Sequence, residues 1–439
     1  MTEGNGKHER IVTNRRRLLI GLGLAGGALT AGLSASRAAQ ESDGEQVADA
    51  PVSDKALERQ PFHGERQAGV VTPRPAAGMI VTFDVLATSP AEVQRLFRTL
   101  TARIAFLMKG GIPPALHERL PPADSGILGP VIPPDNLTMT LSLGASFFEE
   151  RDWLAHLKPV HLSRMTGFPN DALDPALCHG DLSLQISSNT PDTNIHALRD
   201  ILKALPDLLV LRWKQEGSVP VIPPRPDGRS ESARNFLGFR DGSANPDARD
   251  RALMDRIVWV REGSGEPAWA ECGAYQVVRI IRSFVERWDR TPLGEQERII
   301  GRRKGTGAPF GGRTEHDDPD YSGDPQGEVT PLDAHIRLAN PRTDAAEASR
   351  ILRRPFNYSN GVSKSGQLEQ GLLFIAYQAD LEKGFIAIQT RLNDEPLEEY
   401  IKPIGGGYFF TLPGPRDEND YLGRTLLEAA GPAVTGLKS

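Results

Sequence analysis

Apolar and polar positions alternate in a way that divides the first half of the chain into strands and helices. An apolar run predicts a strand over residues 79–86. Ser89, Pro90 and Glu92 then supply an N-cap, a proline at the first helical position and a capping-box glutamate. These signals predict a helix over residues 93–108, directly after the strand.

Two later segments alternate strictly between apolar and polar residues, at 137–143 and at 182–186. This period of two predicts half-buried antiparallel strands. A Thr-Pro-Asp start predicts a further helix over residues 190–204, and a β-rich run follows at 208–213. The resulting order, βαββαβ, is that of a ferredoxin-like unit.

The second half repeats this architecture without obvious sequence identity. We therefore expect an α+β fold with two ferredoxin-like domains, at residues 67–220 and 221–435, preceded by a polar linker or arm at 39–66. Polar loops at 220–245 and 313–330 are too long to be simple connections, so we expect them to be functional. The expected elements of the second half are a strand at 275–281, a helix after Pro292, a strand at 372–377, a helix ending near Leu397 and a strand at 408–412.

The first 38 residues have the pattern of an export signal. Arg15, Arg16 and Arg17 precede a weakly apolar run of about 14 residues that ends in small side chains. This run is shorter than the roughly 20 residues that span a bilayer, so a permanent membrane anchor is not expected. Paired arginines predict the twin-arginine route, and hence a periplasmic or secreted protein exported already folded.

Composition excludes several classes of function. The chain has 439 residues, of which 39% are hydrophobic and 25% charged, so it can form a substantial core. Its net charge is −6 and no basic block follows the N-terminus, which excludes nucleic acid as an expected partner. Two cysteines are too few for a disulfide framework, a four-thiolate zinc site or a cysteine-ligated iron–sulfur cluster.

Three residues stand out as candidates for chemistry. Asp241 lies between glycines in a predicted tight turn, His335 lies in a polar stretch, and Arg353 follows 18 residues later. Taken singly, such residues are more typical of an Asx-turn, a surface or core histidine and a surface cation. A lone histidine without a ligand cluster suits haem better than zinc. The glycine-rich segment 301–307 has neither the Walker nor the dinucleotide spacing, so nucleotide binding is not expected.

Taken together, these segments resemble the dye-decolourising haem peroxidases, and in particular their exported deferrochelatase/peroxidase branch. The resemblance extends over nearly the whole chain after residue 38. It rests on Gly238-Phe239-Arg240-Asp241-Gly242, on the segment from His335 to Arg342, and on Ile351-Leu352-Arg353, in the family's order and spacing. One departure is Arg66, which stands where the family usually has histidine.

The resemblance implies one haem b per chain, held in the C-terminal half of a barrel-like core. His335 would be the axial iron ligand, and Asp241 and Arg353 would be the catalytic pair on the peroxide-binding face. Asp241 would move a proton and Arg353 would stabilise charge on the leaving oxygen. The implied haem contacts are Gly242, Ser243, Ala244, Asn340, Pro341, Arg342 and Arg353.

The implied function is that of an enzyme, a peroxidase that uses hydrogen peroxide and an organic reductant to oxidise bulky dyes or phenols through a ferryl intermediate. The alternative is a deferrochelatase that releases iron from haem with the porphyrin intact, in iron uptake. A haem carrier without turnover is a third class, against which Asp241 argues. Association with iron-uptake components and homo-oligomer formation stay open.

Several details also stay open at this level. Asp380 or Asp333 could accept a hydrogen bond from the second nitrogen of His335, and Cys178 could pair with Cys272. Aromatic residues could transfer electrons from the surface, although core packing is the more typical role for each. These aromatic candidates are Trp259, Trp269, Trp288, Tyr358 and Tyr408.

Overall fold

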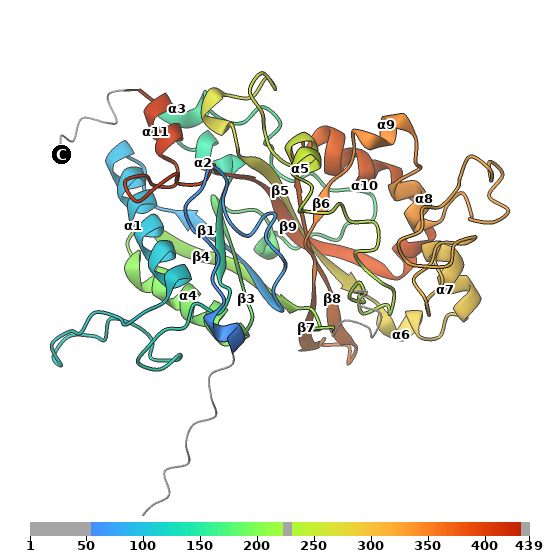
Figure 1. The fold of residues 1–439 in the computed structure, drawn as a ribbon, viewed down its shortest axis with the longest axis horizontal. Coiled ribbons are helices and arrows are strands. Elements are labelled where there is room, and N and C mark those ends of the chain that lie inside the picture. The colour runs from blue at the N-terminus through green and yellow to red at the C-terminus, as the bar shows by residue number, and fades with distance from the viewer. Residues whose placement is uncertain (1–53, 223–230, 432–439) are drawn as a thin grey trace, which may run out of the picture. The chain divides into compact units, whose positions relative to one another are not determined.

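The structure, a computed structural model, describes residues 54–222 and 231–431 (Figure 1). The predicted export signal at 1–38 and the first part of the predicted arm, 39–53, lie outside the described residues. The later part of the arm packs against the folded chain: the Gly64 amide donates to the Pro415 carbonyl at 2.9 Å, and Arg66 forms an ion pair with Asp255 at 2.6 Å.

In the described residues, nine strands form one sheet in the order β5-β9-β2-β3-β1-β4-β7-β8-β6, and β5 also pairs with β8. Eight strands therefore close into an antiparallel barrel, with the short β6 attached to β8. The expected α+β fold with a barrel-like core is confirmed. The strands are β1 (Ala77–Val85), β2 (Thr138–Gly144), β3 (Leu182–Ser188), β4 (Leu209–Ser218), β5 (Ala274–Ser283), β6 (Leu352–Arg353), β7 (Phe356–Val362), β8 (Leu368–Gln378) and β9 (Ile401–Thr411).

The two long helices of the first half begin where their sequence signals predict. Helix α1 (Pro90–Lys109) has a complete capping box, in which the Ser89 hydroxyl accepts from the Glu92 amide and the Glu92 carboxylate accepts from the Ser89 amide. Helix α4 (Pro191–Ala204) begins directly after Thr190. Both lie against the outer face of the barrel, α4 beside β1 and β3 and α1 beside β2 and α4 (Figure 1). The predicted order βαββαβ is confirmed for this half.

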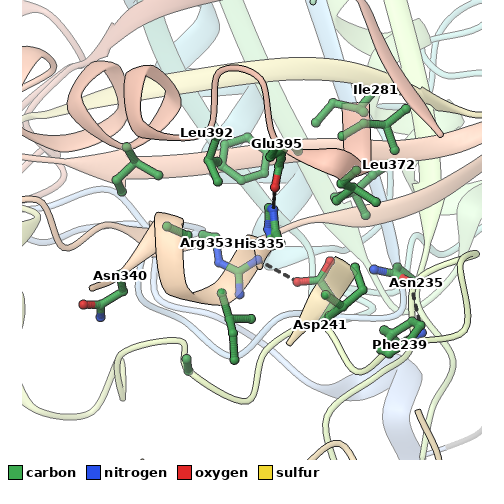
Figure 2. A pocket seen from close by; sticks show the side chains of 18 of the residues that line it. Asn235, Phe239, Asp241, Ile281, His335, Asn340, Arg353, Leu372, Leu392 and Glu395 are labelled. Carbon is green, nitrogen blue, oxygen red and sulfur yellow. Dashed lines mark hydrogen bonds and ion pairs between the residues drawn. The ribbon is translucent and has the colours of Figure 1, made fainter. Parts of the chain in front are cut away.

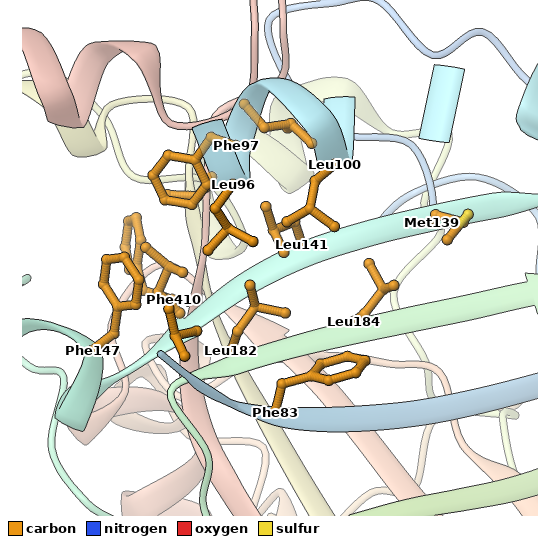
Figure 3. Close-up of a cluster of buried hydrophobic side chains, with 14 of the residues drawn as sticks. Phe83, Leu96, Phe97, Leu100, Met139, Leu141, Phe147, Leu182, Leu184 and Phe410 are labelled. Atoms are coloured by element: carbon orange, nitrogen blue, oxygen red, sulfur yellow. The ribbon is translucent and has the colours of Figure 1, made fainter. Parts of the chain in front are cut away.

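Large apolar side chains fill the space between these helices and the barrel. Leu96, Phe97 and Leu100 of α1 pack toward Leu141 of β2 and Leu184 of β3 (Figure 3). All five are fully buried. Burying a side chain of this size stabilises the fold by about 1.5–3 kcal/mol, so this layer is a principal source of stability.

The prediction that β2 and β3 are half-buried is wrong, because every residue of both strands is buried. Their apolar residues face the helices, and their polar residues face the inside of the barrel, where opposite strands cover them. Several of these buried polar groups are paired: Ser142 bonds Thr411 at 2.8 Å, and the Tyr377 hydroxyl donates to Gln185 at 2.9 Å. Closure of the barrel thus hides a face that strict alternation would assign to solvent.

The second half has the same βαββαβ order, as expected. Its strands are β5, β7, β8 and β9, with α7 (Leu293–Ile300) in the first crossover and α10 (Ala387–Arg391) in the second. The sequence pattern missed β7, whose second half is exposed and contains Ser359, Asn360 and Gly361. The remaining helices are α2 (Ala145–Glu149), α3 (Asp152–Ala155), α5 (Arg251–Ile257), α6 (Val285–Trp288), α8 (His335–Ala339), α9 (Asp344–Glu347) and α11 (Arg424–Ala429).

Two further features concern the whole described chain. Cys178 and Cys272 are both free thiols, so the pairing left open above does not form in this structure. Among residues 54–222 and 231–431, no helix combines the length and apolar character that crossing a membrane requires.

Candidate functional site

A cavity of about 300 Å³ lies on the outer face of the second half of the barrel. Its apolar wall comes from the sheet, through Ile281 of β5 and Leu372 and Phe374 of β8. Helices α8 and α10 and the loop around Asp241 complete it. The position corresponds to the one that α1 and α4 fill in the first half.

His335, the first residue of α8, faces this cavity with about a third of its side chain exposed. Its Nδ1 lies 2.7 Å from Oε2 of Glu395, which is almost fully buried (Figure 2). A carboxylate can only accept here, so Nδ1 carries the proton and donates it to Glu395. In the neutral imidazole, the other ring nitrogen, Nε2, is then unprotonated and can bind a metal.

Two opposing effects act on the pKa of His335. Burial on its own would lower the pKa of His335, but the Glu395 carboxylate raises it by charge and by hydrogen bonding, and the net shift is upward. A more basic imidazole is a stronger electron donor to a metal bound at Nε2. Glu395 therefore both orients His335 and tunes it.

Asp241 and Arg353 also line the cavity and form an ion pair, with Arg353 Nη1 2.7 Å from Asp241 Oδ1 (Figure 2). The aspartate is largely buried, whereas Arg353 keeps 29% of its side chain exposed. The pair thus combines an acid–base group with a fixed cation at one wall. That combination can move a proton and stabilise a developing negative charge.

The turn that carries Asp241 depends on its flanking glycines, as the sequence predicts. Gly238 has φ +85° and Gly242 has φ +148°, backbone conformations that other residues rarely adopt. A Cβ on Gly238 would also meet the Lys304 side chain at 2.6 Å. The glycines therefore fix the path of the loop beside the cavity.

Asn245 connects this loop to β6. Its side-chain oxygen accepts from the Arg353 amide at 2.9 Å, and its side-chain nitrogen donates to the Arg353 carbonyl at 2.9 Å. The two hydrogen bonds fix Arg353 relative to Asp241. No sequence pattern singles out Asn245, because its partner lies 108 residues away.

The second polar loop is anchored beside the same cavity. Arg337 of α8 donates to the Asp324 carboxylate at 3.1 Å and to the Thr330 carbonyl at 2.7 Å. Glu315 accepts from the Ser243 hydroxyl at 2.8 Å, which joins this loop to the Asp241 loop. Both loops that were expected to be functional therefore form walls of the cavity.

The structure brings most of the predicted site residues together, with one exception. Pro341 does not line the cavity. The predicted residues that do line it are Asp241, Gly242, Ser243, Ala244, His335, Asn340, Arg342 and Arg353.

The partner of His335 differs from both candidates considered from the sequence. Asp380 instead pairs with Lys383 at 2.9 Å, and Asp333 is exposed. Glu395 is 60 residues from His335 in the chain, and no local pattern singles it out. The five aromatic candidates for surface electron transfer are all buried, as their core-packing interpretation predicts.

The residues around the cavity suit haem. A flat macrocycle needs apolar walls, an axial ligand and cations for its carboxylates. The walls and His335 meet the first two needs, and Arg302 and Arg342 line the cavity as cations. No group of three or more histidine, cysteine or carboxylate side chains gathers around a possible metal position in residues 54–222 and 231–431. A metal at His335 would therefore need ligands from a group such as a porphyrin.

Family models match both halves of the chain. The model described as "Dyp-type peroxidase, N-terminal" matches residues 67–218, and the one described as "Dyp-type peroxidase, C-terminal" matches residues 232–416. Among curated proteins, the chain is similar to the "Deferrochelatase" of Yersinia pseudotuberculosis serotype I, with 55% identity over 421 residues that cover 96% of each chain.

Solved structures show the same architecture. Ferric DtpA from Streptomyces lividans is 33% identical, with a TM-score of 0.77 over 86% of this chain and 100% of that one. A DypB variant from Rhodococcus jostii RHA1 in complex with heme is 20% identical, with a TM-score of 0.57 over 82% of this chain and 98% of that one, and shares the fold.

Proposed function

Because the chain belongs to the Dyp-type peroxidases, we propose that it binds one haem b in this cavity and acts as a deferrochelatase, releasing the iron and leaving the porphyrin intact. The observation that carries the proposal is that two bonded pairs, His335 with Glu395 and Asp241 with Arg353, line the same cavity. The name of the Yersinia relative favours iron release over dye oxidation.

The haem-facing residues have distinct tasks in this proposal. His335 binds iron through Nε2, and Glu395 holds the imidazole in the required tautomer. Arg302 and Arg342 attract the propionates. Haem is the substrate whose iron is released or, in peroxidase turnover, the redox centre.

Iron release must be balanced by protons. When the iron–nitrogen bonds break, the iron ion leaves and two protons replace it on the pyrrole nitrogens. Asp241 is the carboxyl group placed to deliver protons into the cavity, and Arg353 holds its carboxylate in position through the 2.7 Å ion pair. One carboxyl group carries one proton at a time, so Asp241 takes up a proton from solvent twice for each iron ion released.

Peroxide-dependent oxidation is the second candidate, and membership of a peroxidase family favours it. Membership also implies a peroxide as one substrate. Asp241 would move a proton between the peroxide oxygens, and Arg353 would stabilise charge on the oxygen that leaves. The organic reductant would donate electrons from outside the cavity.

A single assay separates the two activities. Purified protein is mixed with haem, with and without hydrogen peroxide and a dye, while porphyrin fluorescence, chelatable iron and dye absorbance are followed. Deferrochelation predicts that fluorescence and iron rise together in equal amounts. Dye bleaching with no porphyrin fluorescence under any condition would contradict it and favour the second candidate.

We further propose export by the twin-arginine route, from the Arg15–Arg17 pattern. Replacing Arg15 and Arg16 by lysine should retain the precursor in the cytoplasm, which cell fractionation would detect. Unchanged export of this double variant would contradict the route.

A further inference from the structure

A second cavity, of about 220 Å³, lies beside the first one. Asp241 and Arg353 line both cavities. Its other walls include Arg74, before β1, and Arg354, directly after β6. Nothing in the function proposed above uses this space.

Arg354 is buried without adequate partners. Only 5% of it is exposed, and its backbone amide continues the pairing with β8 by donating to the Ile375 carbonyl. Its Nη1 donates to the Thr72 carbonyl, but Nε and Nη2 have no hydrogen-bond partner among the described residues. Leaving such donors unpaired in the interior is unfavourable, because they lose their hydrogen bonds to water and gain none in return.

The charges around this cavity are also unbalanced. Arg74 donates to the Pro355 carbonyl, which carries no net charge. Asp241 is the single carboxylate among the lining residues that the structure describes, and Arg353 already pairs with it. Two guanidinium groups, of Arg74 and Arg354, are therefore left without a counter-charge.

Both groups are cations, because an arginine guanidinium keeps its proton in proteins. Burial lowers the pKa of Arg354, which the nearby Tyr377 raises and Arg74 lowers further, to about 10. Burial also lowers the pKa of Arg74, while Asp241 raises it. Buried cations in proteins are normally paired with an anion, because an isolated charge is costly in a low-dielectric interior.

We propose that the second cavity is a binding site for a small monovalent inorganic anion of the halide class, held between Arg74 and Arg354. The anion supplies the missing acceptor for Arg354 and balances the excess positive charge. It also lies next to the Asp241–Arg353 pair, because the two cavities share these residues. The site is independent of haem, so its failure would not affect the function proposed above.

The position of the anion can be observed directly. Crystals of the purified protein grown with bromide should show an anomalous scattering peak in the second cavity, within hydrogen-bonding distance of Arg354. Peaks at the protein surface alone, or none, would overturn the proposal.

Binding in solution is tested by thermal melting in bromide against gluconate at the same ionic strength. Gluconate gives the same ionic strength but is a bulky organic carboxylate rather than a compact halide. Bromide should raise the melting temperature of the protein saturably, on the order of 2 °C, with or without added haem. An equal melting temperature in the two salts would overturn the proposal.

Variants show which side chains the bromide-dependent shift in melting temperature requires. Arg354→Met should abolish the bromide-dependent shift, Arg354→Lys should retain part of it, and Arg249→Met removes an equal charge from an exposed position and should leave it unchanged. If Arg354→Met does not fold, Arg74→Met provides the same test. A full bromide shift in a folded Arg354→Met or Arg74→Met protein would contradict the site.

Discussion

The two halves of the molecule share one architecture but use the same face of it differently. In the first half, α1 and α4 cover the outer face of the barrel, and side chains such as Phe97 and Leu100 fill the space completely. In the second half, shorter helices and two anchored loops cover the equivalent face and leave a cavity beside Ile281 and Leu372.

The difference shows how one half of a repeated fold can supply most of the stability while the other half carries the reactive groups. The first half gains from complete burial of apolar groups. The second half keeps polar and charged groups at its cavity, and it holds them by hydrogen bonds such as those of Asn245 to Arg353 and of Glu395 to His335. Substitutions in the first half should therefore mainly lower stability, whereas substitutions at the cavity of the second half should mainly impair haem binding or turnover.

The largest effect is expected from His335→Ala. No other histidine lines the cavity in the part of the chain that the structure describes, so the variant should lose stable haem binding while remaining folded. Haem absorbance per protein chain, together with circular dichroism, measures both properties. Normal absorbance and full haem content in the variant would rule out His335 as the axial ligand.

The next largest effects are expected from Asp241→Asn and Arg353→Leu. Both should bind haem, yet the peroxide-induced change in its absorbance spectrum should slow by about 10²- to 10⁴-fold for loss of the acid–base group and 10²- to 10³-fold for loss of the cation. Stopped-flow mixing with peroxide gives the rates. Wild-type rates in both variants at full haem occupancy would show that the pair is misassigned, whereas a defect confined to Arg353→Leu would leave Asp241 a role in shaping the pocket.

A matched pair of leucines tests the comparison itself. Leu100→Ala, in the fully packed half, should lower the free energy of unfolding by about 2–5 kcal/mol. Leu372→Ala, at the cavity wall, should lower it by less than about 2 kcal/mol in haem-free protein, because its side chain is only half-buried. Chemical denaturation measures both, and equal losses would mean that the second face is as tightly packed as the first.

A smaller effect is expected from Glu395→Gln. The amide keeps the size of the side chain but removes the negative charge that orients His335 and raises its pKa. Haem affinity or turnover should fall by about 10- to 100-fold, with little loss of secondary structure. Glu399→Gln, close in sequence but exposed and outside the cavity, serves as the control. An unchanged affinity and turnover in Glu395→Gln would show that Glu395 has no role in haem binding or turnover.

Local signals in the sequence were sufficient for much of the fold. The capping box at Ser89 and the alternation in β2 and β3 depend on neighbours in the chain, and they predicted the element order correctly. Burial of the polar face of β2 and β3 was not predictable, because it depends on strands such as β9 that close the barrel from far along the chain.

The residues of the candidate site also divide into those that the sequence predicts and those that only the structure reveals. Asp241, His335 and Arg353 lie in segments with a recognisable pattern, and the structure places all three at one cavity. Glu395 and Asn245 act through single hydrogen bonds to distant residues, and no periodicity or motif reveals such a contact. Residues that position others are therefore found from the structure rather than from the sequence.

The central claim is that the hollow face of the second half holds haem through His335. A crystal structure of the haem-loaded protein tests it most directly. The account predicts iron bonded to His335 Nε2, with Glu395 still hydrogen-bonded to Nδ1 and with Asp241 and Arg353 on the opposite face of the macrocycle. Haem bound outside this cavity, or iron bonded to another side chain, would contradict the account.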